Sequence, residues 1–435
     1  MPTLPDKCTS FEKSDSMSPS PGAGSSVVHG NNISVEQNRV SSERQRVAQM
    51  ERLLNTQPVD LDALFTVSRL PGGFLRNDLR KKIWPKFLGI NRYDTPDFES
   101  FAEKEVPQQI RCDVERSFWS FNHSKDWSTE KLEEKRRLLG NIITAVLARN
   151  SDLYYYQGFH DVCVVFIEIF EDEPDLAFAI IETVSKHFLK DFMGSDFRTV
   201  TSILPLLLQI VKKVDIKFHA FLSKALTEPY FATSWLITWF SHDIKDLNSV
   251  ARIFDGLLTS HPLFSLYVSV SVVLSCKDKI SNMECEMSQI HNFLVNVCDK
   301  TNVSFDKIFL RADRLMQALP PDKLKKLASE DLCELIFKKE VALFLKPPCI
   351  TRYCDTDAVL LEEVTRRKDM EVAVKKPHLQ SSSSELTDTH ALGDSDHAMW
   401  WLSGAIVSSI TKIVDKILPA SGNAVDSERE VRSEK

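Results

Sequence analysis

The sequence predicts an all-α protein, and three observations support this fold class. Glycine contributes only 13 of 435 residues, which is scarce for folds that depend on tight turns or phosphate-binding loops. Apolar residues recur at helical spacing from near Ser41 to about Leu345. Hydrophobic residues at 43% and charged residues at 26% are typical of a globular protein, so composition excludes wholesale disorder and a protein with many membrane spans.

The N-terminal arm, residues 1–40, is expected to be disordered. Its Ser, Pro, Gly and Asn content buries too little apolar surface to offset the entropy of ordering. Helical structure is expected to begin near Ser41, where Met50 and Leu54 follow at helical spacing. Pro71-Gly-Gly then breaks the chain.

Further helical patterns follow this break. The first carries a basic triplet, Arg80-Lys-Lys, which is expected to face solvent. Two Val-rich runs, residues 162–170 and 266–274, have the composition of strands. Neither has a hairpin signal beside it, and a helix buried on all sides produces the same apolar run, so both are predicted helical. We expect one domain over residues 41–300, completed by helices in residues 301–350.

Three segments of different composition follow the domain. Residues 351–397 are polar and are expected to form a linker, and residues 419–435 are a polar tail. Between them, residues 398–418 are expected to form a helix with one apolar face. The residues on that face are Leu402, Ile406, Ile410, Ile413 and Ile417. Charged residues interrupt this segment before the roughly 20 apolar residues of a membrane span accumulate, so we expect an interfacial membrane helix. A helix that binds a partner protein or this chain is the alternative.

Charge and cysteine content narrow the functional classes. The net charge of -7 argues against nucleic-acid binding. Nine cysteines without a C-x-x-C pair, and no apolar secretory signal at the N-terminus, indicate reduced thiols in an intracellular compartment. Motifs of P-loop proteins, Rossmann enzymes, kinases, zincins and α/β-hydrolases are missing from the sequence, and no metal site is expected.

Two strings carry the residues best suited to chemistry. Asp113 precedes Arg116 by three positions, so it can hold Arg116 on one helix face, although an ordinary surface ion pair explains that spacing equally well. The second string, Tyr154 to Asp161, crowds Gln157, His160 and Asp161 around Gly158. Its simpler interpretation is a set of hydrogen-bonded structural residues at the start of a helix.

A third pair of strings is interpreted as structural. Trp235 and Trp239 lie four residues apart, so they are expected to share one helix face in the core. Arg252 and Asp255 are expected to form a second ion pair at i,i+3 spacing.

In this order and at these separations, the strings resemble the signature motifs of the TBC domain family, whose members activate Rab GTPases. The matching motifs are Ile110-x-x-Asp113-x-x-Arg116, Tyr155-x-Gln157-Gly158, and Trp239-Phe240 leading to Arg252-x-x-Asp255. The Tyr154–Asp161 string looks most like the branch that acts at the endoplasmic reticulum on the Rab of ER-to-Golgi traffic.

The resemblance implies a protein that activates a GTPase and has no catalytic reaction of its own. Arg116 is then an arginine finger and Gln157 orients the attacking water, in trans to a GTP-bound Rab that itself binds Mg²⁺ and GTP. No further cofactor is implied. The supporting residues are Asp113, Tyr155, Gly158, Asp161, Trp235, Trp239, Arg252 and Asp255, and His160 receives no catalytic role.

The implied location is the cytoplasmic face of the endoplasmic reticulum or early secretory membranes, with attachment through residues 398–418. The alternative is a non-catalytic Rab-binding scaffold that keeps the TBC fold. Intact Arg116 and Gln157 argue against this alternative, because a degenerate member is expected to lose one of them.

Overall fold

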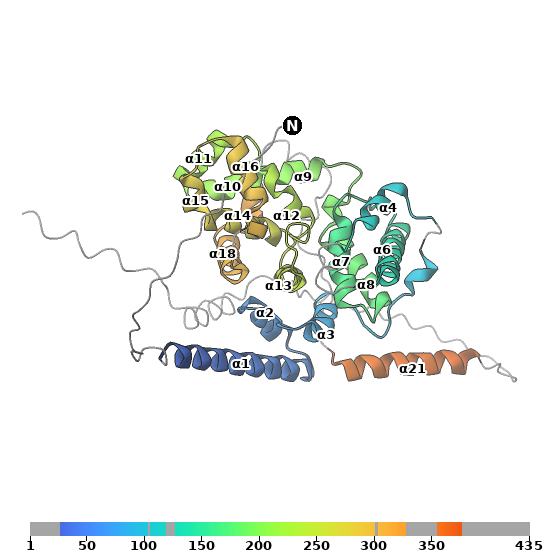
Figure 1. The fold of residues 1–435 in the computed structure, drawn as a ribbon. Coiled ribbons are helices and arrows are strands. Elements are labelled where there is room, and N and C mark those ends of the chain that lie inside the picture. The colour runs from blue at the N-terminus through green and yellow to red at the C-terminus, as the bar shows by residue number, and fades with distance from the viewer. Residues whose placement is uncertain (1–26, 103–104, 119–126, 301–302, 328–354, 376–435) are drawn as a thin grey trace, which may run out of the picture. The chain divides into compact units, whose positions relative to one another are not determined.

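The computed structural model describes residues 27–102, 105–118, 127–300, 303–327 and 355–375. Throughout these residues the regular structure is helical and strands are absent, as the sequence predicts (Figure 1). The chain divides into two compact units, residues 1–48 and 49–435, each of which is described by itself.

The first unit contains most of helix α1 (Val27–Leu54), which corrects the expected boundary of the disordered arm. Residues 27–40 are helical, although we expected disorder up to residue 40. Helix propagation adds one hydrogen bond for each residue fixed, and no proline interrupts the chain between Val27 and Leu54. Low hydrophobicity therefore did not prevent helix formation there. Residues 1–26 lie outside the described residues.

The second unit contains two groups of helices with α13 (Leu247–Leu258) between them (Figure 1). One group comprises α3 (Asn77–Phe87), α4 (Gln108–Glu115), α6 (Thr129–Arg149), α7 (Phe159–Ile169) and α8 (Pro174–His187). The other comprises α9 (Arg198–Ile203), α10 (Pro205–Val214), α11 (Ile216–Ala225), α12 (Thr233–Ile237), α14 (Phe264–Ser275), α15 (Lys277–Ser281), α16 (Met287–Val295), α17 (Val297–Lys300) and α18 (Phe305–Ala318). Because α13 contacts α3 and α7 on one side and α18 on the other, it joins the two groups.

Shorter elements complete the second unit. They are α2 (Leu61–Arg69), α19 (Pro321–Leu324) and four 3-10 turns, η1 (Phe98–Ser100), η2 (Lys190–Phe192), η3 (Tyr230–Ala232) and η4 (Lys325–Leu327). Helix α18 packs against α14, and residues 328–350 lie outside the described residues.

The core between α3, α7 and α13 is aromatic. The ring centroid of Trp84 lies 5.7 Å from that of Phe166 and 6.2 Å from that of Phe254. Trp239 lies 5.2 Å from Phe254 and 5.7 Å from Phe188, both at nearly perpendicular ring angles. Offset and edge-to-face rings contribute about 0.5–1.5 kcal/mol per pair beyond area burial. This cluster fixes α7, and with it the loop that precedes α7.

The two Val-rich runs are helices, as predicted. They form α7 and α14, and nearly every residue of both helices is buried. A helix covered on all sides needs no polar face, so its sequence loses the periodicity that marks surface helices. Burial explains why their strand-like composition is misleading.

Helix α21 (Asp357–Lys375) corrects the expected linker over residues 351–397. Leu360 and Val364 are buried, and Lys86 Nζ lies 2.8 Å from Asp357 Oδ1. Most of the other described side chains of α21 are polar and exposed, so the composition indicated a linker. Two buried apolar residues and the ion pairs of Asp357 and Arg367 nevertheless secure the helix. The remainder of this range lies outside the described residues.

The membrane prediction concerns a segment that the structure does not describe. Of the helices described, none is both long and apolar enough to cross a bilayer. The amphipathic helix expected at residues 398–418 and the tail at 419–435 are outside the described residues.

Candidate functional site

Arg116 lies at the C-terminal end of α4, where it is exposed and oriented by a buried carboxylate. Ile110, Asp113 and Val114 form the buried face of α4, and the helix ends at Arg116. Arg116 Nη2 donates to Asp113 Oδ1, which is the predicted i,i+3 contact. The Arg116 side chain is 55% exposed and that of Asp113 only 4%. The helix therefore anchors the carboxylate and presents the guanidinium.

Gln157 is exposed in the loop that leads into α7. The next residue, Gly158, caps α7 at φ 111°, a left-handed conformation that strongly favours glycine. A Cβ at Gly158 would lie 2.9 Å from Thr238 Cγ2, so the loop closely approaches the chain after α12. Tyr156 Oη donates to the carbonyl of Ile237 at 2.6 Å, which secures the same approach.

Tyr155 joins the two candidate fingers. Its hydroxyl donates to Asp113 Oδ2 at 2.6 Å, so Asp113 binds Arg116 through one oxygen and the Gln157 loop through the other. Burial and the hydrogen bond to Asp113 raise the pKa of Tyr155. Tyr155 consequently stays protonated and donates at neutral pH.

Two histidines and Asp161 extend this network. His160 Nδ1 lies 3.0 Å from Tyr155 Oη, and His160 Nε2 lies 3.4 Å from Asp161 Oδ1. The other oxygen of Asp161 lies 2.9 Å from Nδ1 of His242. Burial lowers the pKa of His160, whereas the hydrogen bond with Asp161 raises that of His242. The buried histidine therefore favours its neutral form and the exposed one favours its charged form.

The turn that carries His242 has an unusual backbone. Trp239 and Phe240 have φ values of 52° and 65°, and both side chains are fully or almost fully buried. Non-glycine residues in this region cost about 1–3 kcal/mol each and persist only where packing determines them. Burial also raises the pKa of the neighbouring Asp243 to about 6. The aromatic core thus holds a strained turn directly against the Gln157 loop.

The structure corrects the expected helix face shared by Trp235 and Trp239. Helix α12 ends at Ile237, so Trp239 lies in the following turn and not on the helix. Both indole rings are buried, as expected, but they pack against different partners. Trp235 stacks on Phe240 with centroids 5.6 Å apart, whereas Trp239 packs against Phe254. Spacing alone could not reveal the left-handed residues that end the helix.

Arg252 and Asp255 also have different partners from those predicted. Asp255 is fully buried and accepts from Arg80 Nε at 3.0 Å, Arg80 Nη2 at 2.9 Å, Trp84 Nε1 at 2.9 Å and the Phe74 amide at 3.0 Å. Arg80 is thus buried, which corrects its expected exposure within the basic triplet. Arg80, on α3, thus donates to the Asp255 carboxylate, and i,i+3 spacing cannot indicate this contact between helices.

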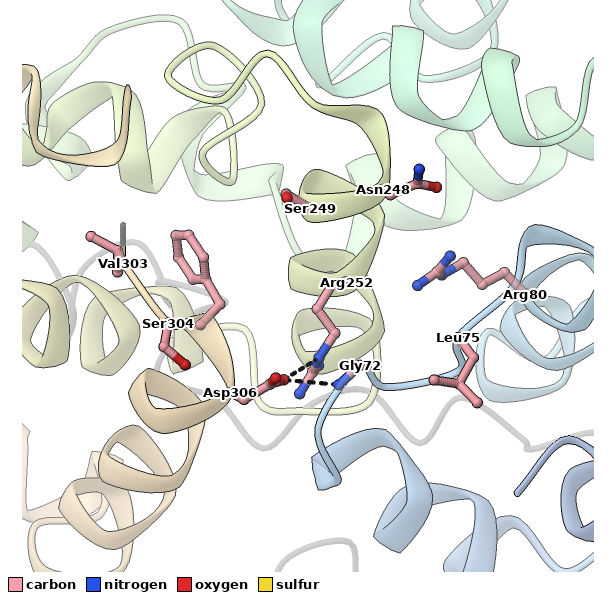
Figure 2. Close-up of a pocket in the computed structure, with 10 residues that line it drawn as sticks. Gly72, Leu75, Arg80, Asn248, Ser249, Arg252, Val303, Ser304 and Asp306 are labelled. Carbon is pink, nitrogen blue, oxygen red and sulfur yellow. Dashed lines mark hydrogen bonds and ion pairs between the residues drawn. The ribbon is translucent and has the colours of Figure 1, made fainter. Parts of the chain in front are cut away.

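Arg252 instead joins the α2–α3 connection to α18. Its Nε donates to Asp306 Oδ1 at 3.0 Å, and the Gly72 amide donates to the same oxygen at 3.0 Å. Figure 2 shows Arg252 and Asp306 beside Gly72 at a cavity of about 370 Å³. Arg252 and Asp255 therefore each join α13 to another helix.

Sequence reasoning missed three residues near the fingers: His160, His242 and Asp243. His160 stood within a singled-out string but received no role, and His242 and Asp243 follow Phe240 after one intervening serine. Their position two and three residues after an aromatic motif was the available signal. Among the described residues, no group of three His, Cys, Asp or Glu residues is placed to hold a metal ion.

Known proteins are similar to this chain in sequence and in fold. The Rab-GTPase-TBC domain model matches residues 77–281. The chain is 32% identical over 289 residues to human TBC1 domain family member 20, covering 66% of this chain and 70% of that protein. It is 30% identical over 262 residues to the Schizosaccharomyces pombe GTPase-activating protein gyp10, covering 58% and 67% of the two chains. The crystal structure of the Ypt/Rab-GAP domain of Gyp1p matches with a TM-score of 0.51 at 17% identity, covering 63% of this chain and 98% of that one.

Proposed function

The chain belongs to the RabGAP TBC domain family, and from this premise we propose that it accelerates GTP hydrolysis by a GTP-bound Rab GTPase. Arg116 and Gln157 act in trans on the nucleotide, which the Rab holds together with Mg²⁺. One observation supports this proposal most. Both side chains are exposed, while the Asp113–Tyr155 hydrogen bond that joins their supports is partly buried.

Arg116 has the chemistry of an arginine finger. Phosphoryl transfer builds negative charge on phosphate oxygens, and a planar, permanently charged guanidinium matches that charge in two-point contacts. Asp113 restrains Arg116 through Nη2, so less rotamer entropy is lost when the guanidinium docks. More than half of the side chain nevertheless remains accessible to a partner.

Gln157 has the chemistry needed to orient water. A side-chain amide donates and accepts hydrogen bonds, so it can hold a water and a phosphate oxygen together. The left-handed Gly158 and the Tyr156–Ile237 hydrogen bond fix the backbone on its C-terminal side. A fixed backbone limits the positions that this amide samples, which favours in-line attack.

We assign the substrate to the Rab of ER-to-Golgi traffic. Support comes from the resemblance of the Tyr154–Asp161 string to the ER-associated branch. The corresponding location is the cytoplasmic face of the endoplasmic reticulum.

Membrane attachment through residues 398–418 completes this proposal. If the segment is helical, Leu402, Ile406, Ile410, Ile413 and Ile417 line one face, and its two adjacent tryptophans suit a membrane interface. Flotation of the full chain with liposomes tests the attachment. We expect Ile406→Asp with Ile410→Asp to abolish flotation, and unchanged flotation would contradict this part of the proposal.

Single-turnover phosphate release tests the activity. The full chain is mixed with each member of a panel of GTP-loaded Rabs that includes the ER-to-Golgi member. We expect strong acceleration of that Rab, which either Arg116→Ala or Gln157→Ala abolishes. Rab binding without acceleration by the wild-type protein would instead indicate the non-catalytic scaffold.

A further inference from the structure

His160 occupies the position where the supports of both fingers meet. Its ring is buried at the start of α7, and its Nδ1 lies within 3.6 Å of three polar groups. These groups are Tyr155 Oη at 3.0 Å, the Gly158 amide nitrogen at 3.4 Å and Asp113 Oδ2 at 3.6 Å. Gly158 directly follows Gln157, and Asp113 holds Arg116. One imidazole nitrogen therefore faces the supports of both candidate fingers.

One neutral tautomer of His160 binds the Gly158 amide and Asp161 together, although it leaves no proton for the 3.0 Å contact between Nδ1 and the Tyr155 hydroxyl. With Nδ1 unprotonated, it accepts from the Gly158 amide, and the Tyr155 hydroxyl donates to Asp113 at 2.6 Å. The proton on Nε2 then points to Asp161 Oδ1, 3.4 Å away. Because the identity of the protonated nitrogen follows from the partner of the other nitrogen, Asp161 selects this tautomer.

We propose that His160 is a positioning residue for GTP hydrolysis, which couples the Gln157 loop to the Asp113–Arg116 pair through its neutral Nδ1. This inference rests on the proposed function, since Arg116 and Gln157 are fingers only if the chain activates a Rab. His160 itself touches neither substrate nor nucleotide. It acts by holding the Gly158 backbone at a fixed place relative to Tyr155 and Asp113.

Protonation of His160 would break this coupling. A proton on Nδ1 lets the ring donate to Tyr155 Oη, so the Gly158 amide loses its acceptor. The charged groups facing the ring are Asp113 and Arg116 from α4, Asp161 from α7, and His242 from the turn after α12. The carboxylates favour the imidazolium, but burial outweighs them and lowers the pKa of His160. The uncoupled state therefore forms only below the usual histidine range near pH 6.5.

Two substitutions in the full chain distinguish the contribution of the His160 Nδ1 atom from that of the ring volume. His160→Phe fills a similar volume without a hydrogen-bonding atom, whereas His160→Asn places an amide oxygen near the position of Nδ1. In single-turnover assays with the most responsive GTP-loaded Rab, we expect Phe to lower the saturating rate about tenfold to a hundredfold. The Rab concentration at half-saturation should change less than about threefold, because the exposed docking surface is unchanged.

His160→Asn should recover most of the rate and remove the acid limb that wild type shows below about pH 6.5. His261→Asn is the matched control, since His261 is also buried and its Nδ1 accepts the Leu263 amide at 3.0 Å. We expect His261→Asn to keep the wild-type rate and acid limb. A His160→Phe rate within about twofold of wild type, or a loss confined to Rab affinity, overturns the proposal.

Nuclear magnetic resonance of the full chain provides a test that needs no activity. With ¹⁵N-labelled histidine and glycine, the Gly158 amide signal should shift with pH in step with the His160 ring nitrogens. It should lose this dependence in His160→Asn. A Gly158 amide signal that does not change as His160 titrates overturns the coupling, whether or not a Rab is accelerated. If no Rab responds but the coupling is observed, the proposed function fails and the coupling stands.

Discussion

Two aspartate–arginine clusters in this domain use the same chemistry in opposite environments. At the finger site, Asp113 is buried but Arg116 is 55% exposed. In the scaffold, Asp255 and its partner Arg80 are both buried, with side chains at most 2% exposed. Removing a partner from a buried pair leaves an uncompensated charge, whereas an exposed guanidinium can exchange its carboxylate for another anion. Burial of the arginine therefore separates a structural ion pair from one suited to act on a partner.

The largest expected effect is the loss of stimulated hydrolysis when the exposed arginine, Arg116, is removed. Arg116→Ala should lower the stimulated hydrolysis rate by about 10³–10⁵, which corresponds to roughly 4–7 kcal/mol of barrier. Its free energy of unfolding should fall by no more than about 1 kcal/mol, because the guanidinium removed is exposed and Asp113 keeps its hydrogen bond from Tyr155. Single-turnover phosphate release and thermal unfolding measure the two quantities.

Arg76→Ala is a matched control for Arg116. Its side chain is 57% exposed and pairs with Asp78, but it precedes α3 and lies outside the finger network. We expect both its hydrolysis rate and its stability to stay near wild type. A similar loss of rate in both variants would show that exposed arginines contribute through general charge and not as a finger.

The next effect breaks the buried cluster. Asp255→Ala removes the acceptor of four hydrogen bonds and leaves Arg80 buried without its carboxylate. We expect the free energy of unfolding to fall by about 3–5 kcal/mol, as is typical when one partner of a buried pair is lost. Denaturant unfolding measures this change. Asp78→Ala, in an exposed pair, should cost no more than about 1 kcal/mol.

A smaller effect concerns the loop between the two clusters. Gly158→Ala adds a Cβ where φ is 111° and where Thr238 Cγ2 would lie 2.9 Å away. We expect a loss of about 1–3 kcal/mol in stability, with slower hydrolysis because Gln157 is displaced. Gly194→Ala is the control, since its nearest contact would be an ordinary 3.6 Å. Equal stability losses in the two variants would show that the Gly158 conformation is unstrained.

The smallest expected effect is the pH dependence of the stability that the His242–Asp161 pair contributes. The hydrogen bond with Asp161 raises the pKa of His242, so this pair stabilises the fold fully below about pH 6.5, the unfolded value. The stabilisation is lost as pH rises through the higher folded pKa. The difference in melting temperature between wild type and His242→Asn should therefore be larger at about pH 6 than at about pH 8.5, with the ionic strength held constant.

His219→Asn is the control for this pH dependence. Desolvation lowers the pKa of His219, so its contribution changes with pH in the opposite direction. The difference between wild type and His219→Asn should not shrink as pH rises. A pH-independent difference between wild type and His242→Asn would show that the Asp161 contact does not form in solution.

Much of the finger site could be predicted from local sequence. Spacing places Asp113 and Arg116 on one helix turn, and their contact is present because it depends only on helix geometry. The helical identity of α7 and α14 was also predictable, since neither run had a strand partner. Partners could not be assigned to Arg80, Asp255 and Arg252, because the Arg80–Asp255 and Arg252–Asp306 contacts join residues 175 and 54 positions apart. Local sequence carries no information about such contacts.

Motif order and residue type were sufficient for the all-helical class, the TBC family and the two candidate fingers. Helical periodicity and short-range pairing are local properties, so they can be read along the chain. Only the tertiary structure decided which arginine is exposed and which is buried, that Trp239 and Phe240 form a strained turn, and that His160 lies beside residues that support both candidate fingers. These features depend on packing between distant helices, which sets burial, and burial determines whether a charged side chain supports the fold or remains available to a partner.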